Sequence, residues 1–105
     1  MAYDEEMADR VRAVLAGGVV TERRMFGGLA FLLGGRMGVA VSTRGVMVRV
    51  DPAELETLLQ DPGVEQVEMG ARTMSGWLRV PGEALDDDRV LQRWVQRGVD
   101  QVRSL

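Results

Sequence analysis

The 105-residue sequence contains no cysteine, no histidine and no lysine. Without cysteine there is no disulfide, no thiol nucleophile and no thiolate metal site, and without histidine there is no imidazole ligand or imidazole general base. An enzyme built from this chain would depend on carboxylates, arginines, Tyr3 and a few hydroxyl groups. We therefore expect no catalytic residue, no metal site and no cofactor.

Long apolar runs are also missing, since none approaches the roughly 20 residues that span a bilayer. The first ten residues are acidic and lack the apolar segment of a signal peptide, so we expect a cytoplasmic protein with no membrane partner. An apolar content of 46% and a charged content of 28% are typical of a globular protein. The length predicts one domain, residues 1–105.

Basic residues are in slight deficit, and the net charge is −3. All 13 basic residues are arginines. This balance does not favour a general nucleic-acid binder, which usually carries a basic excess. The arginines nevertheless concentrate in the expected strands and the acids in the expected helices, so a local basic surface remains open.

Residues 23–42 form the longest apolar tract and organise the rest of the chain. Two Gly-Gly pairs, at 27–28 and 34–35, divide this tract into pieces of strand length, as bends and hairpin turns do. With the alternating valines that follow, the pattern predicts four antiparallel strands at 19–26, 29–33, 37–42 and 46–50.

The flanking segments predict three helices and two more strands. Apolar residues at helical spacing predict helices over 4–16 and from Asp86 onward, and Asp51-Pro52 predicts the start of a short third helix. Residues 64–69 and 76–80 predict strands joined by an exposed loop over 70–75. The order helix, four strands, helix, two strands, helix predicts an α+β fold in two layers, with an antiparallel sheet of about six strands covered by helices.

Single positions carry further expectations. Trp94 belongs to the apolar stripe of the last helix and is expected in the core. Trp77 and Leu78 are neighbours on a strand and face opposite ways, so we expect one of them to be exposed and assign Trp77 to a candidate interaction surface. The small residues Gly38, Ala40 and Ser42 alternate along one face of a strand and would let a helix approach closely.

Three other patterns were weighed as binding sites. The glycines of residues 27–38 lack the spacing of a phosphate-binding loop, so hairpin turns explain them. The three consecutive acids that begin at Asp86 cannot converge on one cation, and they indicate a solvated helix start. Arg23, Arg24 and Arg72 are candidates for a basic sheet edge, although neighbouring Arg23 and Arg24 point to opposite faces and only one can join it.

Several blocks carry a family resemblance: Arg24-Met25-Phe26-Gly27-Gly28, then 29–31 with a glycine turn, 48–50 before a short helix, 70–77, and the closing Trp94 helix. Over nearly its whole length the sequence resembles the TfoX N-terminal domain of the TfoX/Sxy competence regulators, here as a stand-alone domain.

The resemblance implies an α+β fold similar to that of secretion chaperones, which commonly dimerise. It also implies a link to DNA-uptake competence and transcriptional control, which the full-length regulators exert with a second, C-terminal domain. It transfers no catalytic or ligand residue. The motif residues are expected to be structural, with Met25 and Phe26 in the core and Gly27-Gly28 forming a bend.

Together these observations predict a non-enzymatic regulatory or protein-interaction module that forms a homodimer and acts on a protein partner. Its candidate interaction surface comprises Arg23, Arg24, Arg72 and Trp77. The alternative is a nucleic-acid-associated transcriptional regulator that binds DNA through an Arg-rich sheet edge.

Overall fold

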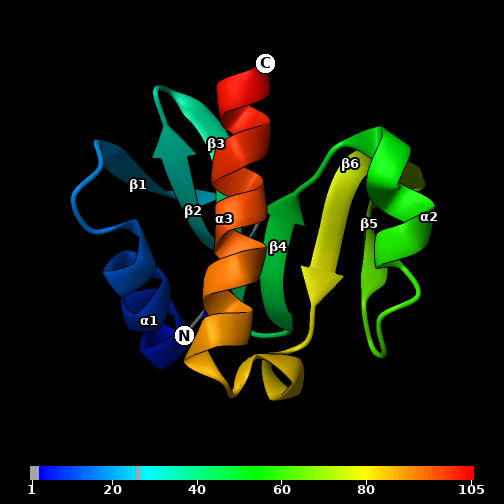
Figure 1. Ribbon diagram of the computed structural model, residues 1–105, viewed down its shortest axis with the longest axis horizontal. Helices are drawn as coiled ribbons and strands as arrows, with labels where there is room; N and C mark the ends of the chain where they lie inside the picture. The colour runs from blue at the N-terminus through cyan, green and yellow to red at the C-terminus, as the bar shows by residue number, and fades with distance from the viewer. Residues whose placement is uncertain (1–2, 26) are drawn as a thin grey trace.

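The computed structural model describes residues 3–25 and 27–105, with the side chain of Met69 left out. It has an α+β fold in which helices pack on an open antiparallel sheet of six strands (Figure 1). The strands are β1 Val20–Met25, β2 Gly28–Leu33, β3 Arg36–Ser42, β4 Gly45–Arg49, β5 Glu65–Met69 and β6 Arg72–Val80. The α-helices are α1 Glu5–Leu15, α2 Leu55–Leu58 and α3 Asp88–Ser104, and 3-10 turns span Pro52–Glu54 and Gly82–Leu85.

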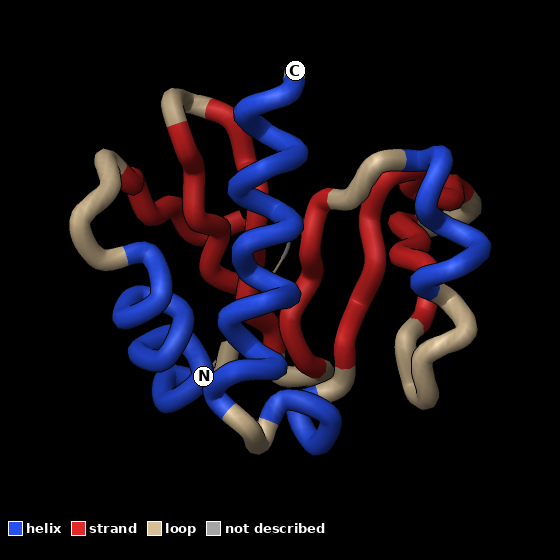
Figure 2. The backbone as a smooth tube through the Cα atoms, viewed as in Figure 1, coloured by secondary structure: helices blue, strands red, loops and turns tan. Residues whose placement is uncertain are grey.

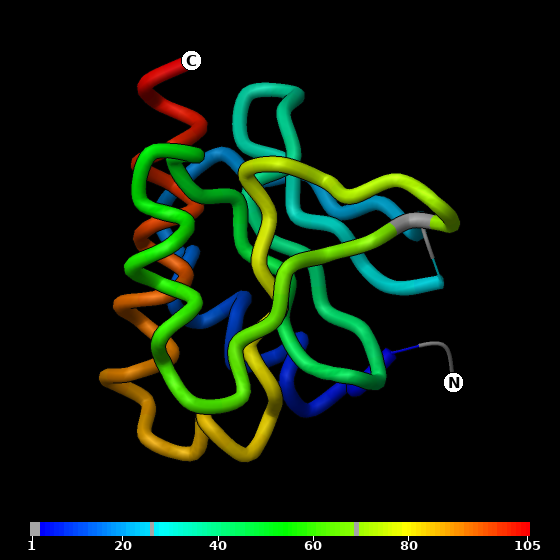
Figure 3. The backbone as a smooth tube through the Cα atoms, turned by 90° about the vertical axis from the view of Figure 1, so that its right-hand side faces the viewer, coloured from blue at the N-terminus to red at the C-terminus, as the bar shows by residue number. Residues whose placement is uncertain are grey.

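The sheet order is β1-β2-β3-β4-β6-β5, with every neighbouring pair antiparallel. The helices pack against one face of this sheet, where α3 crosses β3 and β4 and α1 packs beside α3 (Figures 1 and 2). The other face therefore carries no helix from the described residues. A view from the side shows α2 and α3 on one flank, while the start of β2 and the turn between β5 and β6 project the opposite way (Figure 3).

Aspartates begin the helical segments, as their short acceptor side chains suit the first free backbone N–H groups. Asp51 accepts a hydrogen bond from the backbone nitrogen of Ala53 at 2.9 Å, which confirms the predicted cap. Asp87 does the same for Arg89 at 2.8 Å, so the acidic run is the start of α3.

The main core lies between the sheet and the helices. Trp94 is only 7% exposed there, which confirms its predicted place in the core. Its other large members come from strands and helices alike, among them Val11, Leu29, Phe31, Val39, Val41, Val46, Val48, Leu78, Val80, Leu85, Leu91 and Val95.

Two glycines set the closest approach between α3 and the sheet. A Cβ added at Gly98 would lie 2.5 Å from the carbonyl oxygen of Gly38, and one at Gly38 would lie 3.1 Å from the oxygen of Gly98. The prediction that Ala40 shares this face is wrong, because Ala40 belongs to the opposite cluster. The register between β2 and β3 shifts after Phe31, and this irregularity breaks the simple alternation along β3.

The hairpin formed by β5 and β6 differs from the sequence prediction. Residues 72–75 belong to β6, which begins at Arg72, so Gly70 and Ala71 alone separate β5 from β6. The predicted exposed loop over 70–75 is therefore wrong. The register of β5 against β6 shifts between Gln66 and Glu68, and Gly76 in β6 has a positive φ of 83°. These irregularities break the regular alternation along β6 by which a strand is recognised from its sequence.

Candidate functional site

The face of the sheet opposite the helices carries its own apolar cluster, made only of strand residues. We call it the helix-free face. Its buried members are Ala30, Ala40, Met47, Val67 and Trp77, and the partly buried Met25, Leu32, Met37 and Met74 pack against them. This face holds the second apolar cluster of the described structure and no described helix covers it, so it is the first candidate for contact with another molecule.

Trp77 is one of the buried members of this cluster and is not exposed. Its exposed fraction is 4%, and that of Leu78, which faces the main core, is 0%. The expectation that one of the two is exposed is therefore wrong. Trp77 is shielded because Arg49 sits over its ring, with the guanidinium carbon 5.3 Å from the ring centroid. Arg49 is held there partly by a hydrogen bond that its Nη1 donates to the carbonyl oxygen of Met37, at 3.3 Å.

The family motif lies at the start of the same face. Met25 is partly buried against the helix-free cluster, not in the main core as the sequence suggested. Phe26, the other predicted core residue of the motif, lies outside the described residues. Gly27 has a positive φ of 71° in the turn, and a Cβ at Gly28 would collide with the carbonyl oxygen of Val41 on β3. The two glycines thus serve a bend and a close backbone approach.

The predicted basic sheet edge is not assembled as one edge. Arg23 and Arg24 lie exposed on the edge strand β1, whereas the exposed Arg72 lies on β6, with β2, β3 and β4 in between. Arg23 lies two residues before Met25 on β1 and therefore shares the helix-free face with it. Arg24, between them, faces the helix side. Trp77 belongs to the helix-free face as well.

Two arginines that the sequence did not single out join this face. Arg49 covers Trp77, and Arg79 follows Trp77 at a two-residue step. The Nε of Arg79 is buried and has no hydrogen-bond partner among the described residues. The two-residue period of a strand could have identified both arginines from the sequence. Arg49 lies two residues from Met47, and Arg79 lies two residues from Trp77, so each pair shares one face.

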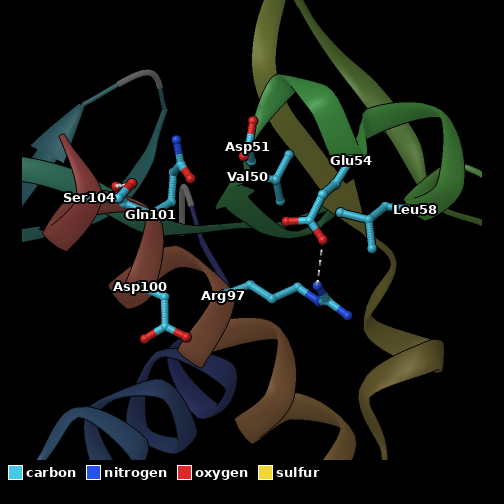
Figure 4. Close-up of a pocket in the computed structure, with 8 residues that line it drawn as sticks. All are labelled: Val50, Asp51, Glu54, Leu58, Arg97, Asp100, Gln101 and Ser104. Carbon is cyan, nitrogen blue, oxygen red and sulfur yellow. Dashed lines mark hydrogen bonds and ion pairs between the residues drawn. The ribbon is translucent and has the colours of Figure 1, made fainter.

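A separate cleft of about 240 Å³ lies between α3 and the segment that begins α2 (Figure 4). Its lining comprises Val50, Asp51, Glu54, Leu58, Arg97, Asp100, Gln101 and Ser104. Arg97 reaches Glu54 across it at 3.6 Å, while Asp51 is occupied as the helix cap. In the part of the chain that the structure describes, no three acidic side chains gather to hold a metal ion. The cleft is an open groove with a largely polar lining, and one ion pair between Arg97 and Glu54 crosses it.

The shifted pKa values belong to structural contacts. Hydrogen bonds from the Arg12 guanidinium, at 2.6 and 2.8 Å, hold the pKa of Glu22 below its usual range and raise the pKa of Arg12. This pair joins α1 to β1. The capping hydrogen bond from the backbone of Arg89 lowers the pKa of Asp87. Each shift has a structural cause and none calls for a catalytic role.

Comparison with known families agrees with this architecture. The family model of the TfoX N-terminal domain matches residues 12–102, which include the motif, all six described strands and nearly all of α3. A comparison with curated proteins gave no match. Among residues 3–25 and 27–105, no helix has the length and apolar character to cross a membrane. The chain therefore belongs to the TfoX N-terminal domain family.

Proposed function

We propose that this domain is a non-enzymatic regulatory module that works by binding another protein through the helix-free face. The observation that carries the proposal is the second apolar cluster, whose border residues Met25, Leu32, Met37 and Met74 remain partly accessible. Partly accessible apolar side chains around a buried cluster commonly mark interaction sites. The absence of cysteine and histidine from the sequence supports a role without catalysis.

Methionine suits such a role because its side chain is flexible and polarisable. It adapts to differently shaped partners at little cost, which is why it recurs at interaction surfaces. Four of the seven methionines of the chain, Met25, Met37, Met47 and Met74, belong to the helix-free face. Family membership gives the role its context, that of a competence-regulator-like domain.

Site-specific photo-crosslinking in living cells tests the proposal. A photoreactive amino acid replaces Met74 on the helix-free face or, as the control, the exposed Arg93 on α3. We expect a discrete crosslinked protein at position 74 and none at position 93. Equal products at both positions, or none at position 74, would contradict the proposal.

A homodimer is part of the proposed function. The supporting observation is the edge strand β1, which pairs only with β2 among the described strands and so keeps one row of backbone groups free for a second copy. Light scattering on the purified chain at micromolar concentrations measures this directly. A strict monomer over that range would remove the dimer and leave the partner-binding role untouched.

A nucleic-acid-associated regulator is the second candidate. The observation that favours it is the presence of Arg23, Arg49, Arg72 and Arg79 on one face. Binding of this kind would weaken steeply as salt rises, because phosphate contacts release counterions. Retention on a double-stranded DNA column at low salt is the measurement, and a chain that flows through without retention removes this candidate.

A further inference from the structure

The helix-free face combines its apolar cluster with a strong local excess of positive charge. Strand alternation places Arg23, Arg49, Arg72 and Arg79 on it, since they step by two from Met25, Met47, Met74 and Trp77. The same alternation gives the face one acidic strand residue, Glu65, two steps from Val67. The whole chain has a net charge of −3, so this face has the opposite sign to the molecule that carries it.

These four arginines have no carboxylate partner in the described structure. The ion pairs found among residues 3–25 and 27–105 involve Arg10, Arg12, Arg89 and Arg97. Glu65 lies opposite Arg79 in the strand register, yet no ion pair joins their side chains in this part of the chain. The orphaned Nε of Arg79 is a buried donor beside the apolar cluster. A buried donor without an acceptor is costly, and an incoming carboxylate would remove that cost.

From this combination we infer that the helix-free face binds an acidic polypeptide segment that also carries large apolar side chains. The apolar side chains would pack against the methionines that border Trp77, and the acidic ones would pair with the surrounding arginines. The inference rests on the proposed function and names the chemistry of its partner. Arginine suits this role because its planar guanidinium binds a carboxylate through two parallel hydrogen bonds.

A second copy of the chain fits this face poorly. A symmetric dimer buries the same patch of both subunits, so it would bring four arginines against four arginines with only one glutamate on each side. The self-association proposed above therefore belongs to the edge strand β1 and not to this face.

Nucleic acid also fits this face less well than an acidic peptide. Single-stranded bases stack on exposed aromatic rings, and the Trp77 ring is 4% exposed beneath Arg49. The buried members of the face are apolar side chains, which offer nothing to a phosphate backbone. An acidic segment with apolar side chains uses both the apolar cluster and the arginines around it.

The test selects peptides from a random 16-residue library displayed on phage, with the full chain as target. We expect the enriched sequences to combine a net negative charge with Leu, Met or Phe residues. Synthetic versions of the enriched peptides, labelled for fluorescence anisotropy, then give Kd values. Enrichment of basic or uncharged sequences would overturn the inference.

A matched pair of double variants locates the binding. Arg23→Glu/Arg72→Glu reverses two exposed charges on the helix-free face, whereas Arg24→Glu/Arg44→Glu makes the same change in net charge at exposed positions off that face. We expect the first variant to weaken peptide binding by about tenfold and the second to change it by less than about twofold. Equal losses in both variants would show a general charge effect and overturn the inference.

Other occupants give distinct results with the same reagents. Double-stranded DNA that binds more tightly than the peptides, and is lost only in Arg23→Glu/Arg72→Glu, would assign the face to nucleic acid. A dimer that Met74→Asp converts to a monomer would assign it to a second copy. A crosslinked partner at position 74 whose capture is unaffected by Arg23→Glu/Arg72→Glu would keep the proposed function and discard the acidic partner.

Discussion

The two faces of one sheet are built from different side chains. The face beneath the helices is lined by valine, leucine and phenylalanine, and its glycines let α3 approach the backbone of β3. The helix-free face is richer in methionine: four methionines lie there with two alanines, Leu32, Val67 and Trp77, and arginines surround them. Branched and aromatic side chains pack into one arrangement, whereas methionine adapts to many. The contrast suggests that one face carries the stability of the domain and the other its interactions.

Truncating one side chain on each face of strand β6 tests this contrast most strongly. Leu78 is fully buried in the main core and Met74 is partly buried on the helix-free face. We expect Leu78→Ala to lower the free energy of unfolding by about 2–5 kcal/mol, because it leaves a cavity. Met74→Ala should cost less, about 1–2 kcal/mol, because part of its side chain already meets solvent. Urea denaturation measures both, and similar losses would erase the difference between the faces.

The glycine contact tests how tightly the helix layer is fitted. Gly98→Ala places a Cβ against the backbone of Gly38, and we expect a loss of about 1–3 kcal/mol from overpacking. Alanine otherwise stabilises a helix interior relative to glycine, so a gain in stability would mean that α3 can move away from β3. Gly82→Ala is the control, since a Cβ there meets nothing within 4 Å.

Each face also has an arginine over a tryptophan. Arg49 lies 5.3 Å from the centroid of Trp77, and Arg97 lies 5.6 Å from that of Trp94. Because Arg49 is half-buried and Arg97 exposed, we expect Arg49→Gln to cost about 1 kcal/mol and Arg97→Gln about 0.5 kcal/mol. Thermal unfolding of both variants gives the comparison. A larger loss at Arg97 would reverse the expected order.

The smallest expected effect concerns the pair that fastens α1 to the sheet. Arg12 lowers the pKa of Glu22 in the folded state, so this pair stabilises the fold above the ordinary glutamate pKa of 4.5 and loses its effect as pH falls through the lower folded value. We expect Glu22→Gln to flatten that acid-side decline without changing stability near neutral pH by a large amount, because both groups are exposed. Unfolding curves recorded between pH 2 and pH 6 measure this decline in stability. In an Arg12→Gln background, chains with Glu or Gln at position 22 should show the same pH dependence.

Sequence patterns predicted the three α-helices and six strands that the structure describes, and the Gly34-Gly35 turn between β2 and β3. The errors arose where a local rule was interrupted. The register shift in β5, which pairs with β6, is why residues 72–75 were predicted as a loop. The irregular pairing of β2 with β3 places Ala40 on the opposite face from Gly38, the glycine that contacts α3. Both depend on a neighbouring strand, so neither is visible in the strand's own residues.

The candidate interaction surface was predicted only in part. Arg23, Arg72 and Trp77 do share the helix-free face, whereas Arg24 lies on the other side of β1. Trp77 was assigned to the surface because the alternation along a strand predicts which face a side chain lies on. It does not predict which neighbouring side chains cover that face. Arg49 covers it here, from the adjacent strand β4, which pairs Arg49 with Trp77 in the register.

The chain's local chemistry settles the order and type of the helices and strands, where the helix caps and most turns lie, and which catalytic and metal chemistries lack their usual residues. These properties depend on residues within a few positions of one another. The folded arrangement settles which face of each strand the helices cover, how Gly38 meets Gly98, and that four arginines from three strands gather around one apolar cluster. Those contacts join residues tens of positions apart, so they come into being only when the strands pair and α3 packs across them.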